Sequence, residues 1–206
     1  MLRIRFHGRG GQGMKTASRI LGSAAFHAGL AVQDAPIYGA ERRGFPMAAF
    51  TRIAHAPILE RGAIVQADLV VVADDTLLTD AAAQPLAGCA AQCTLVVNST
   101  RDETALRHTT AHDGRLLVAD FTTLALAWTQ TLAGLSTALG VAAVHLVGLP
   151  LADSLAGLDE ELNAIARDLE RTAAGVRVVG PRLLYTQPEQ ERMRTLLRIA
   201  GKEVEA

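Results

Sequence analysis

The chain has 206 residues, half of them hydrophobic but only 4% aromatic, so it can bury a sizeable core made mainly of Ala, Leu and Val. Its formal net charge is −1, and it has no basic tail, no run of Lys and Arg and no interleaving of aromatic with basic residues, which argues against nucleic acid as a partner. Its two cysteines, Cys89 and Cys93, are too few for a disulfide framework or for an iron–sulfur cluster, which takes about four ligands.

The first 120 residues alternate short apolar runs with helical patterns. Residues 1–8 carry charges and lack the apolar run of a signal peptide, so we expect a cytoplasmic protein. Residues 13–29 have the period of a helix whose apolar face carries Ala17, Ile20, Leu21, Ala24 and Ala25. Strands are expected over residues 2–6, 30–36, 47–54, 56–60, 67–73, 93–99 and 115–120, with a turn between the third and the fourth.

Residues 121–152 carry no formal charge apart from what His145 acquires. The stretch is long enough to span a bilayer, but Thr, Gln, Ser and Gly recur in it, and Gly140 and Pro150 interrupt it. We therefore expect helices near residues 121–139 and 141–149 and no membrane span. These helices would form a buried pair or present a face to another subunit.

The alternation of strands and helices predicts an α/β fold. We expect a three-layer α/β/α domain over residues 1–180, with a Rossmann-like, mostly parallel sheet and an antiparallel piece near residues 46–60. A C-terminal helical extension over residues 181–206 would follow. Gly157, or the stretch 173–182, is the expected sign of where the compact part ends.

A glycine-rich loop joins the first strand to the first helix. Gly8, Gly10 and Gly13 have the G-x-G-x-x-G spacing, in the strand–loop–helix setting that gives this motif its meaning. Glycine adopts positive φ without strain and lets a ligand approach the main chain, and a helix N-terminus favours an anion. A phosphate or a carboxylate would fit, with Gln12 adding a hydrogen bond and Lys15 a charge. The alternative is that the glycines form only a tight turn, although four glycines are more than a turn needs.

Two features near the same sheet edge point to different ligands. Asp34 follows Gly13 by 21 residues, at the end of the second strand, where an acid would bind the ribose 2′-hydroxyl of a nicotinamide cofactor. The loop after that strand contains Glu41, Arg42 and Arg43, and guanidinium groups bind phosphate in a bidentate manner. A surface ion-pair cluster is the alternative interpretation of this loop.

Two stretches together, GRGGQG at 8–13 and YGAERRGFPMAAFTRI at 38–53, resemble the gamma subunit of the 2-oxoacid:ferredoxin oxidoreductases of the pyruvate and ketoisovalerate group. The resemblance continues through ADLVVVADDTLL at 67–78 and LVVNST at 95–100, and weakly through residues 138–151. It covers roughly residues 2–150.

The resemblance implies one subunit of an enzyme that oxidatively decarboxylates a 2-oxoacid to an acyl-coenzyme A and passes the electrons to ferredoxin. The partners would be alpha, beta and ferredoxin-like subunits, which would hold thiamine diphosphate, Mg²⁺ and iron–sulfur clusters. This chain would hold no cofactor, metal or catalytic residue alone, but would contact coenzyme A as a substrate. The residues expected to do so are Gly8, Gly10, Gly11, Gln12, Gly13, Arg42, Arg43, Asn98 and Ser99.

All of these residues follow the carboxyl ends of predicted strands, where open α/β sheets bind ligands, and coenzyme A brings a pyrophosphate and a 3′-phosphate. Asn98 and Ser99 have the alternative role of ending a strand and starting a turn. Two other functions stay open: a free-standing NAD(P)-dependent oxidoreductase that uses Asp34, and a scaffold subunit whose glycine loop binds nothing.

The remaining candidate residues are weaker. His108 and His112 are four residues apart but have no third ligand at a telling spacing, so we expect a solvated helix and turn there. Asp74 and Asp75 follow a strand and are expected to cap the next helix. His7 and His145 are expected in or near the core, each with a neighbour that satisfies it.

Overall fold

The computed structural model describes residues 1–36, 44–129 and 134–172 of the chain. Its strands are β1 (Leu2–Arg9), β2 (Ala31–Pro36), β3 (Pro46–Ala54), β4 (Leu69–Val72), β5 (Thr94–Asn98) and β6 (Leu116–Ala119). Its helices are α1 (Met14–His27), α2 (Glu103–Thr110), α3 (Phe121–Thr129), α4 (Gly134–Val147) and α5 (Leu151–Thr172), with the 3-10 helix η1 (Asp75–Thr79) after β4.

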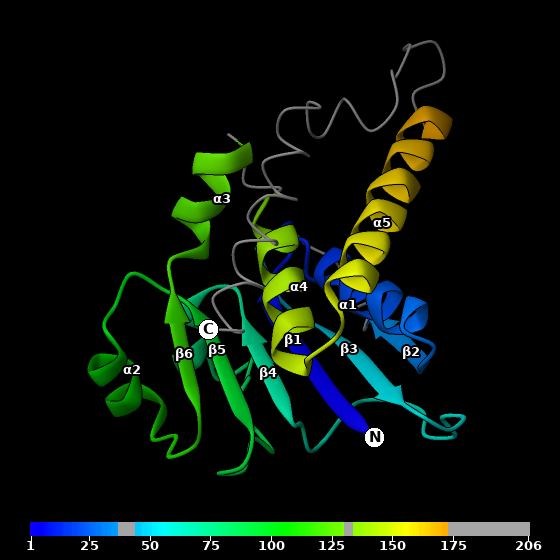
Figure 1. The fold of residues 1–206 in the computed structure, drawn as a ribbon. Coiled ribbons are helices and arrows are strands. Elements are labelled where there is room, and N and C mark those ends of the chain that lie inside the picture. The colour runs from blue at the N-terminus through cyan, green and yellow to red at the C-terminus, as the bar shows by residue number, and fades with distance from the viewer. Residues whose placement is uncertain (37–43, 130–133, 173–206) are drawn as a thin grey trace.

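The six strands form one mixed sheet in the order β2–β3–β1–β4–β5–β6 (Figure 1). β1, β4, β5 and β6 are parallel neighbours, and β3 runs antiparallel to both β1 and β2. The predicted α/β fold, mostly parallel with an antiparallel piece near residues 46–60, is thus confirmed. The strand order differs from that of a Rossmann fold in one respect. Here β3 lies beside β1, in the position that the second strand occupies in a Rossmann fold.

The predicted strand over residues 56–60 is wrong, because these residues belong to a loop. Pro57 has no N–H to donate to a strand ladder. The Glu60 carboxylate binds the Arg3 guanidinium, with an N–O distance of 2.6 Å, and lies 3.4 Å from Arg52 Nε. The loop is therefore held to the sheet by side chains, and the antiparallel partners of β3 are β1 and β2 rather than residues 56–60.

The first core lies between the sheet and α1, α4 and α5. The predicted apolar face of α1 is confirmed, since none of its five side chains is exposed. Small residues let the helices approach closely: a Cβ on Gly140 of α4 would lie 3.0 Å from the Ala17 carbonyl oxygen, and one on Gly157 of α5 would lie 2.3 Å from the Ala24 nitrogen. Gly157 is therefore a packing position inside a helix, and its predicted role as a domain boundary is wrong.

The second core lies on the opposite face of the sheet, under η1, α2 and the segments before β4 and β5. It includes Val70, Val72, Leu95 and Val97 of the sheet together with Leu77 and Leu106. Cys93 is buried in it and Cys89 is half-buried against it, which agrees with two small packing side chains.

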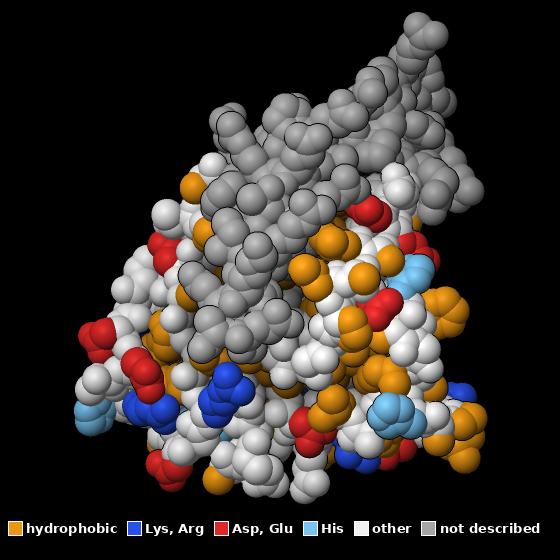
Figure 2. Space-filling view, in the orientation of Figure 1, with side chains coloured by type: hydrophobic (Ala, Val, Ile, Leu, Met, Phe, Trp, Pro, Cys, Tyr) orange, Lys and Arg blue, Asp and Glu red, His pale blue; other side chains and the backbone are white. Residues whose placement is uncertain are grey.

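The uncharged stretch after β6 forms α3 and α4, whose bounds differ from the predicted ones. Gly140 lies inside α4 rather than between helices, because it faces α1 where a side chain would not fit. α4 is largely buried along one side, whereas α3 exposes Leu124 and Leu126. The predicted core position of His145 is wrong, because this residue lies near the end of α4 with its side chain exposed. Figure 2 shows hydrophobic side chains gathered over α4 and the start of α5.

α3 and α5 extend beyond the end of the sheet toward which β4 and β6 point (Figure 1). None of the described helices combines the length and the apolar character that crossing a bilayer requires. The predicted extension over residues 181–206 lies outside the described residues.

Candidate functional site

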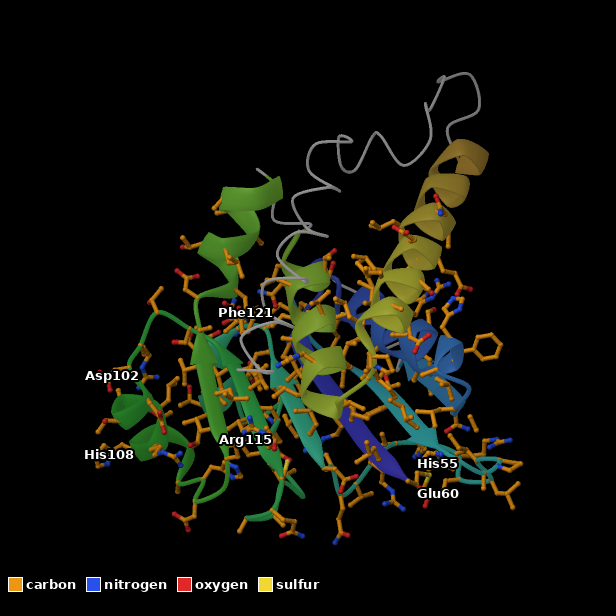
Figure 3. All side chains as sticks on the ribbon, in the orientation of Figure 1. His55, Glu60, Asp102, His108, Arg115 and Phe121 are labelled. Atoms are coloured by element: carbon orange, nitrogen blue, oxygen red, sulfur yellow. The ribbon has the colours of Figure 1, made fainter. Side chains whose placement is uncertain are left out.

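The candidate site lies at the edge of the sheet where the parallel strands end. β1, β4 and β5 are adjacent and in register, so the segments that follow them lie beside one another. These segments are the glycine loop, the pair Asp74 and Asp75, and the pair Asn98 and Ser99. Figure 3 shows Phe121 at this end of the sheet, after β6, and His55 and Glu60 at the opposite end. The structure therefore brings together the predicted site residues that belong to the described part of the chain.

Different physical constraints require glycine at the different positions of the loop. A Cβ on Gly8 would lie 2.6 Å from Met14 Cγ, and one on Gly13 would lie 2.6 Å from Ser136 Cβ, so packing alone requires these two glycines. Gly13 also has a φ of 73° and Gly11 a φ of 98°, which favour glycine at both positions. Gly10 pairs with the start of β3: its N–H donates to the Phe45 carbonyl oxygen, and its own carbonyl accepts from the Gly44 N–H.

The loop leads directly into α1. Gly13 is the N-cap of α1, no side chain caps this end, and the first turn contains no acidic residue. α4 begins nearby and runs parallel to α1, since Ser136 meets Gly13 and Gly140 meets Ala17 one turn further along both helices. Two helix N-termini therefore lie at the same edge, and their dipoles both favour negative charge there.

Gln12 closes the loop on itself. Its side-chain oxygen accepts from the Arg9 N–H at 2.6 Å, and its own N–H donates to the Arg9 carbonyl oxygen at 2.9 Å. The Gln12 side-chain nitrogen donates to Asp74 Oδ2 at 3.2 Å. Both ends of this amide thus bind the protein, which differs from the ligand contact that the sequence predicts for it.

Asp74 connects the loop to the end of β4. Its Oδ2 accepts from Arg9 Nε at 3.1 Å and from Gln12, while its Oδ1 accepts from the Thr76 N–H at 3.1 Å. Burial opposes ionisation of Asp74, but the Thr76 hydrogen bonds, together with Gln12 and Arg9, outweigh it and hold the pKa of the carboxyl below its usual value. The predicted capping role is confirmed for Asp74, which is the N-cap of η1, but not for Asp75, which is the first residue of η1 and accepts a hydrogen bond from Ser99.

Asn98 and Ser99 bridge the neighbouring segments. The Asn98 side-chain nitrogen donates to the Ala73 carbonyl oxygen and to Thr122 Oγ1, each at 2.8 Å, and its oxygen accepts from the Thr122 N–H. The Ser99 hydroxyl donates to Asp75 and accepts from the Arg101 N–H. Asn98 is the last residue of β5, which agrees with the alternative role of ending a strand. The bonds to the end of β4 and the start of α3 are contacts that the sequence did not predict.

Asp34 lies away from the glycine loop. It belongs to the edge strand β2, which β3 separates from β1. Its Oδ1 accepts from the Ser18 hydroxyl of α1 at 2.7 Å, and burial raises the pKa of the Asp34 carboxyl despite this bond. The inserted β3 thus removes Asp34 from the position in which an acid would bind a ribose beside the loop.

Arg42 and Arg43, with Glu41, lie outside the described residues, which resume at Gly44. Their role in phosphate binding stays a prediction. Gly44 has a φ of 90°, and a Cβ there would meet no atom within 4 Å. The described chain resumes at Gly44, whose N–H donates to the Gly10 carbonyl oxygen, so it re-enters beside the glycine loop.

Sequence reasoning missed Arg9, although a signal for it exists. Along β1, Arg3, Arg5, His7 and Arg9 alternate with apolar residues, and this period of two places all four on the face of the second core. The buried Arg5 guanidinium donates to backbone carbonyls of Ile64, Val65, Pro85 and Ala87. Arg3 and Arg5 thus bind other parts of the fold, whereas Arg9, at the end of β1, reaches the candidate site.

His7 is buried as predicted, but its Nε2 has no hydrogen-bond partner among the described residues, so the prediction of a satisfied histidine is wrong. Burial, with a smaller effect of the Arg5 charge, lowers the pKa of His7 to about 4. The imidazole is therefore neutral at pH 7.

The described residues contain no group of three or more His, Cys, Asp or Glu side chains that would hold a metal ion. His108 is exposed, whereas His112 is buried with its Nε2 3.0 Å from the Cys93 carbonyl oxygen. The expectation of a solvated helix and turn is thus right for His108 and wrong for His112.

Comparison with known proteins gives consistent matches. Residues 3–177 match the family described as pyruvate ferredoxin/flavodoxin oxidoreductase. The pyruvate synthase subunit PorC of Thermotoga maritima is 46% identical over 123 residues, which are 60% of this chain and 62% of that subunit. The pyruvate/ketoisovalerate oxidoreductases common subunit gamma of Pyrococcus furiosus is 37% identical over 174 residues, covering 81% of this chain and 93% of that subunit.

Solved structures match over almost the whole chain. The crystal structure of pyruvate oxidoreductase subunit PORC from Thermotoga maritima has a TM-score of 0.69 and 31% identity, and covers 96% of this chain and 93% of that one. The gamma subunit of a keto/oxoacid ferredoxin oxidoreductase from Geobacter sulfurreducens has a TM-score of 0.60 at 16% identity, covers 97% of this chain and 99% of that one, and shares the fold.

Proposed function

Because the chain belongs to the pyruvate ferredoxin/flavodoxin oxidoreductase family, as a gamma subunit of a multi-subunit 2-oxoacid:ferredoxin oxidoreductase, we propose that its glycine loop borders the coenzyme A pocket of that complex. In the overall reaction a 2-oxoacid loses carbon dioxide, the acyl group passes to coenzyme A, and the two electrons pass to ferredoxin. The loop would hold the pyrophosphate or the 3′-phosphate of coenzyme A and leave the chemistry to the partner subunits.

The observation that carries the proposal is the uncapped N-terminus of α1 behind a loop with two glycines at positive φ. The backbone N–H groups there and the dipoles of α1 and α4 favour a phosphate, and the first turn of α1 presents no carboxylate that would repel one. Arg42 and Arg43 would add bidentate contacts from the adjoining loop. Gly8, Gln12, Asn98 and Ser99 would act by shaping this edge, since packing or hydrogen bonds within the protein occupy them.

The cofactors of the reaction would reside in the partner subunits. Two cysteines supply fewer ligands than an iron–sulfur cluster takes, and the described residues contain no group of three or more His, Cys, Asp or Glu side chains that could hold a metal ion. We place thiamine diphosphate, Mg²⁺ and the clusters in the alpha, beta and ferredoxin-like subunits. A cytoplasmic location is part of the same proposal, because both cysteines are free thiols in the structure.

The partner subunits would also select the 2-oxoacid. The relative from Pyrococcus furiosus is a common subunit of pyruvate and ketoisovalerate oxidoreductases, so one gamma subunit serves two substrates there. We propose that this chain likewise leaves the choice of the acid to the subunits that bind thiamine diphosphate.

The test is Gly11→Val in the reconstituted complex, with 2-oxoacid oxidation titrated against coenzyme A. A side chain at Gly11 would occupy the space beside the loop amides, and we expect the KM for coenzyme A to rise about tenfold or more, with intact assembly. Gly29→Val is the matched control: Gly29 also has positive φ, but it lies at the far end of α1 with no atom within 4 Å of a Cβ. An unchanged KM in Gly11→Val, or an equal rise in both variants, would leave the loop without a coenzyme A role, as in a scaffold subunit.

A further inference from the structure

The side chain of Arg9 joins the three segments that border the glycine loop. Its Nε donates to Asp74 Oδ2, one terminal nitrogen donates to Thr76 Oγ1 at 2.7 Å, and the other donates to the Gly44 carbonyl oxygen at 3.3 Å. Arg9 is the last residue of β1, Gly44 precedes β3, and Asp74 and Thr76 follow β4. One guanidinium thus fixes the loop relative to the strands on both sides of β1.

The loop itself has few other attachments through side chains. Within it, the pair of bonds between Arg9 and Gln12 closes the turn, and Gln12 in turn binds the same Asp74 oxygen as Arg9. Asp74 Oδ2 therefore accepts hydrogen bonds from both Arg9 and Gln12, the two side chains that set the shape of the loop. Its Oδ1 accepts from the Thr76 N–H. The carboxylate is also shielded, with a fifth of its side chain exposed.

We propose that Arg9 and Asp74 are a positioning pair that holds the glycine loop in the shape that receives coenzyme A. The inference rests on the proposed function, and it names residues that touch no ligand themselves. Arg9 shapes the loop through three hydrogen bonds, one from each nitrogen of its planar guanidinium group, and a lysine cannot reproduce this arrangement. Asp74 acts through Arg9 and Gln12.

The fold offers a matched control on the same strand. Arg3 lies on the same face of β1 and forms an ion pair with Glu60, with an N–O distance of 2.6 Å. Glu60 lies at the opposite end of the sheet from the candidate site (Figure 3). Arg3→Gln therefore removes a charge and an ion pair from β1 without touching the loop.

The experiment compares Arg9→Gln, Arg9→Lys, Asp74→Asn, Arg9→Gln/Asp74→Asn and Arg3→Gln in the reconstituted complex. The first readout is the KM for coenzyme A against kcat at saturating coenzyme A, and the second is hydrogen exchange of the amides of residues 10–16. We expect Arg9→Gln and Asp74→Asn to raise the KM about tenfold and to speed loop exchange, with kcat within twofold of the wild type. The double variant should be no worse than the worse single one, because the pair acts as a unit.

Arg9→Lys should fall between the wild type and Arg9→Gln, and Arg3→Gln should match the wild type in both readouts. Unchanged loop exchange in Arg9→Gln, or additive effects in the double variant, would overturn the positioning pair. Faster loop exchange with an unchanged KM would leave the pair in place and instead overturn the coenzyme A site, so the two failures are distinguishable.

Discussion

At the scale of single residues, His7 is a buried polar side chain in β1 that lowers the stability of the fold. Its imidazole lies opposite Ala48 of β3 and Val72 of β4, and its buried Nε2 has no partner among the described residues. The ring must stay neutral there, whereas an unfolded chain accepts a proton near the ordinary pKa of about 6.5. Burial thus links the stability of the subunit to pH.

We expect the free energy of unfolding of the purified subunit to fall by about 2 kcal/mol from His7 alone as the pH drops from 7 to 5. The pKa of His7 is about 4 in the folded chain, so below pH 6.5 the unfolded state binds a proton that the folded state does not, and unfolding becomes easier. Urea unfolding of the wild type and of His7→Leu at both pH values measures the difference. An equal fall in the variant would contradict the assignment. Asp34 acts in the opposite direction, because burial raises its folded pKa.

Asp34 provides a second test at this scale. Asp34→Asn keeps an oxygen that accepts from the Ser18 hydroxyl and removes a charge that burial disfavours. We expect 2-oxoacid oxidation and the KM for coenzyme A to stay within about twofold of the wild type, with unfolding free energy unchanged or higher. Loss of an NADH-induced melting shift in this variant, in a wild type that shows one, would support a nicotinamide enzyme instead.

At the scale of elements, the sequence indicates α1 and every predicted strand except residues 56–60, because burial sets the period of the apolar residues in both kinds of element. The parallel strands β4 and β5 are apolar runs, and the helical face of α1 faces a core. The insertion of β3 between β1 and β2 could not be predicted, because it depends on long-range pairing rather than on a local pattern. For the same reason the sequence placed Asp34 beside the loop, where the structure does not.

For the candidate site too, the sequence indicates the local features but not the contacts between distant segments. The spacing of Gly8, Gly10 and Gly13 indicates a loop at a helix N-terminus, and the structure has one. The sequence could not show that the side chains of Gln12 and Asn98 form hydrogen bonds within the protein, because those bonds join segments far apart in the chain. The alternation along β1 is a signal for Arg9, but it does not indicate the hydrogen-bond partners of Arg9, which lie near positions 44 and 75.

The contact between α1 and α4 gives a prediction for helix packing. Gly13→Ala places a Cβ at positive φ and 2.6 Å from Ser136 Cβ, so we expect it to lower the free energy of unfolding by about 2–4 kcal/mol. Gly29→Ala carries the same backbone penalty in open space and should cost only about 1 kcal/mol. Adding Ser136→Gly to Gly13→Ala should recover part of the loss. Equal losses for the two alanine variants in urea unfolding would argue against the close contact.

At the scale of the whole molecule, the uncharged α3 stands beyond the sheet with Leu124 and Leu126 each 41% exposed. In a subunit of a larger complex, exposed apolar side chains on a projecting helix suit contact with a partner. We expect Leu124→Asp to leave the subunit folded and to weaken its assembly with the partner subunits by about tenfold or more. Leu59→Asp, at a side chain that is 86% exposed in the loop after β3, is the control. Assembly constants that agree for both variants and the wild type would remove α3 from the interface.

The central claim is that coenzyme A binds against the glycine loop of this subunit, and hydrogen exchange of the assembled complex tests it most directly. Exchange is measured with and without saturating coenzyme A, in the absence of 2-oxoacid. We expect slower exchange at the amides of residues 10–16, where the loop enters α1, and unchanged exchange at the far end of α1 near Gly29. Saturating coenzyme A binding with no change at residues 10–16 would contradict the account.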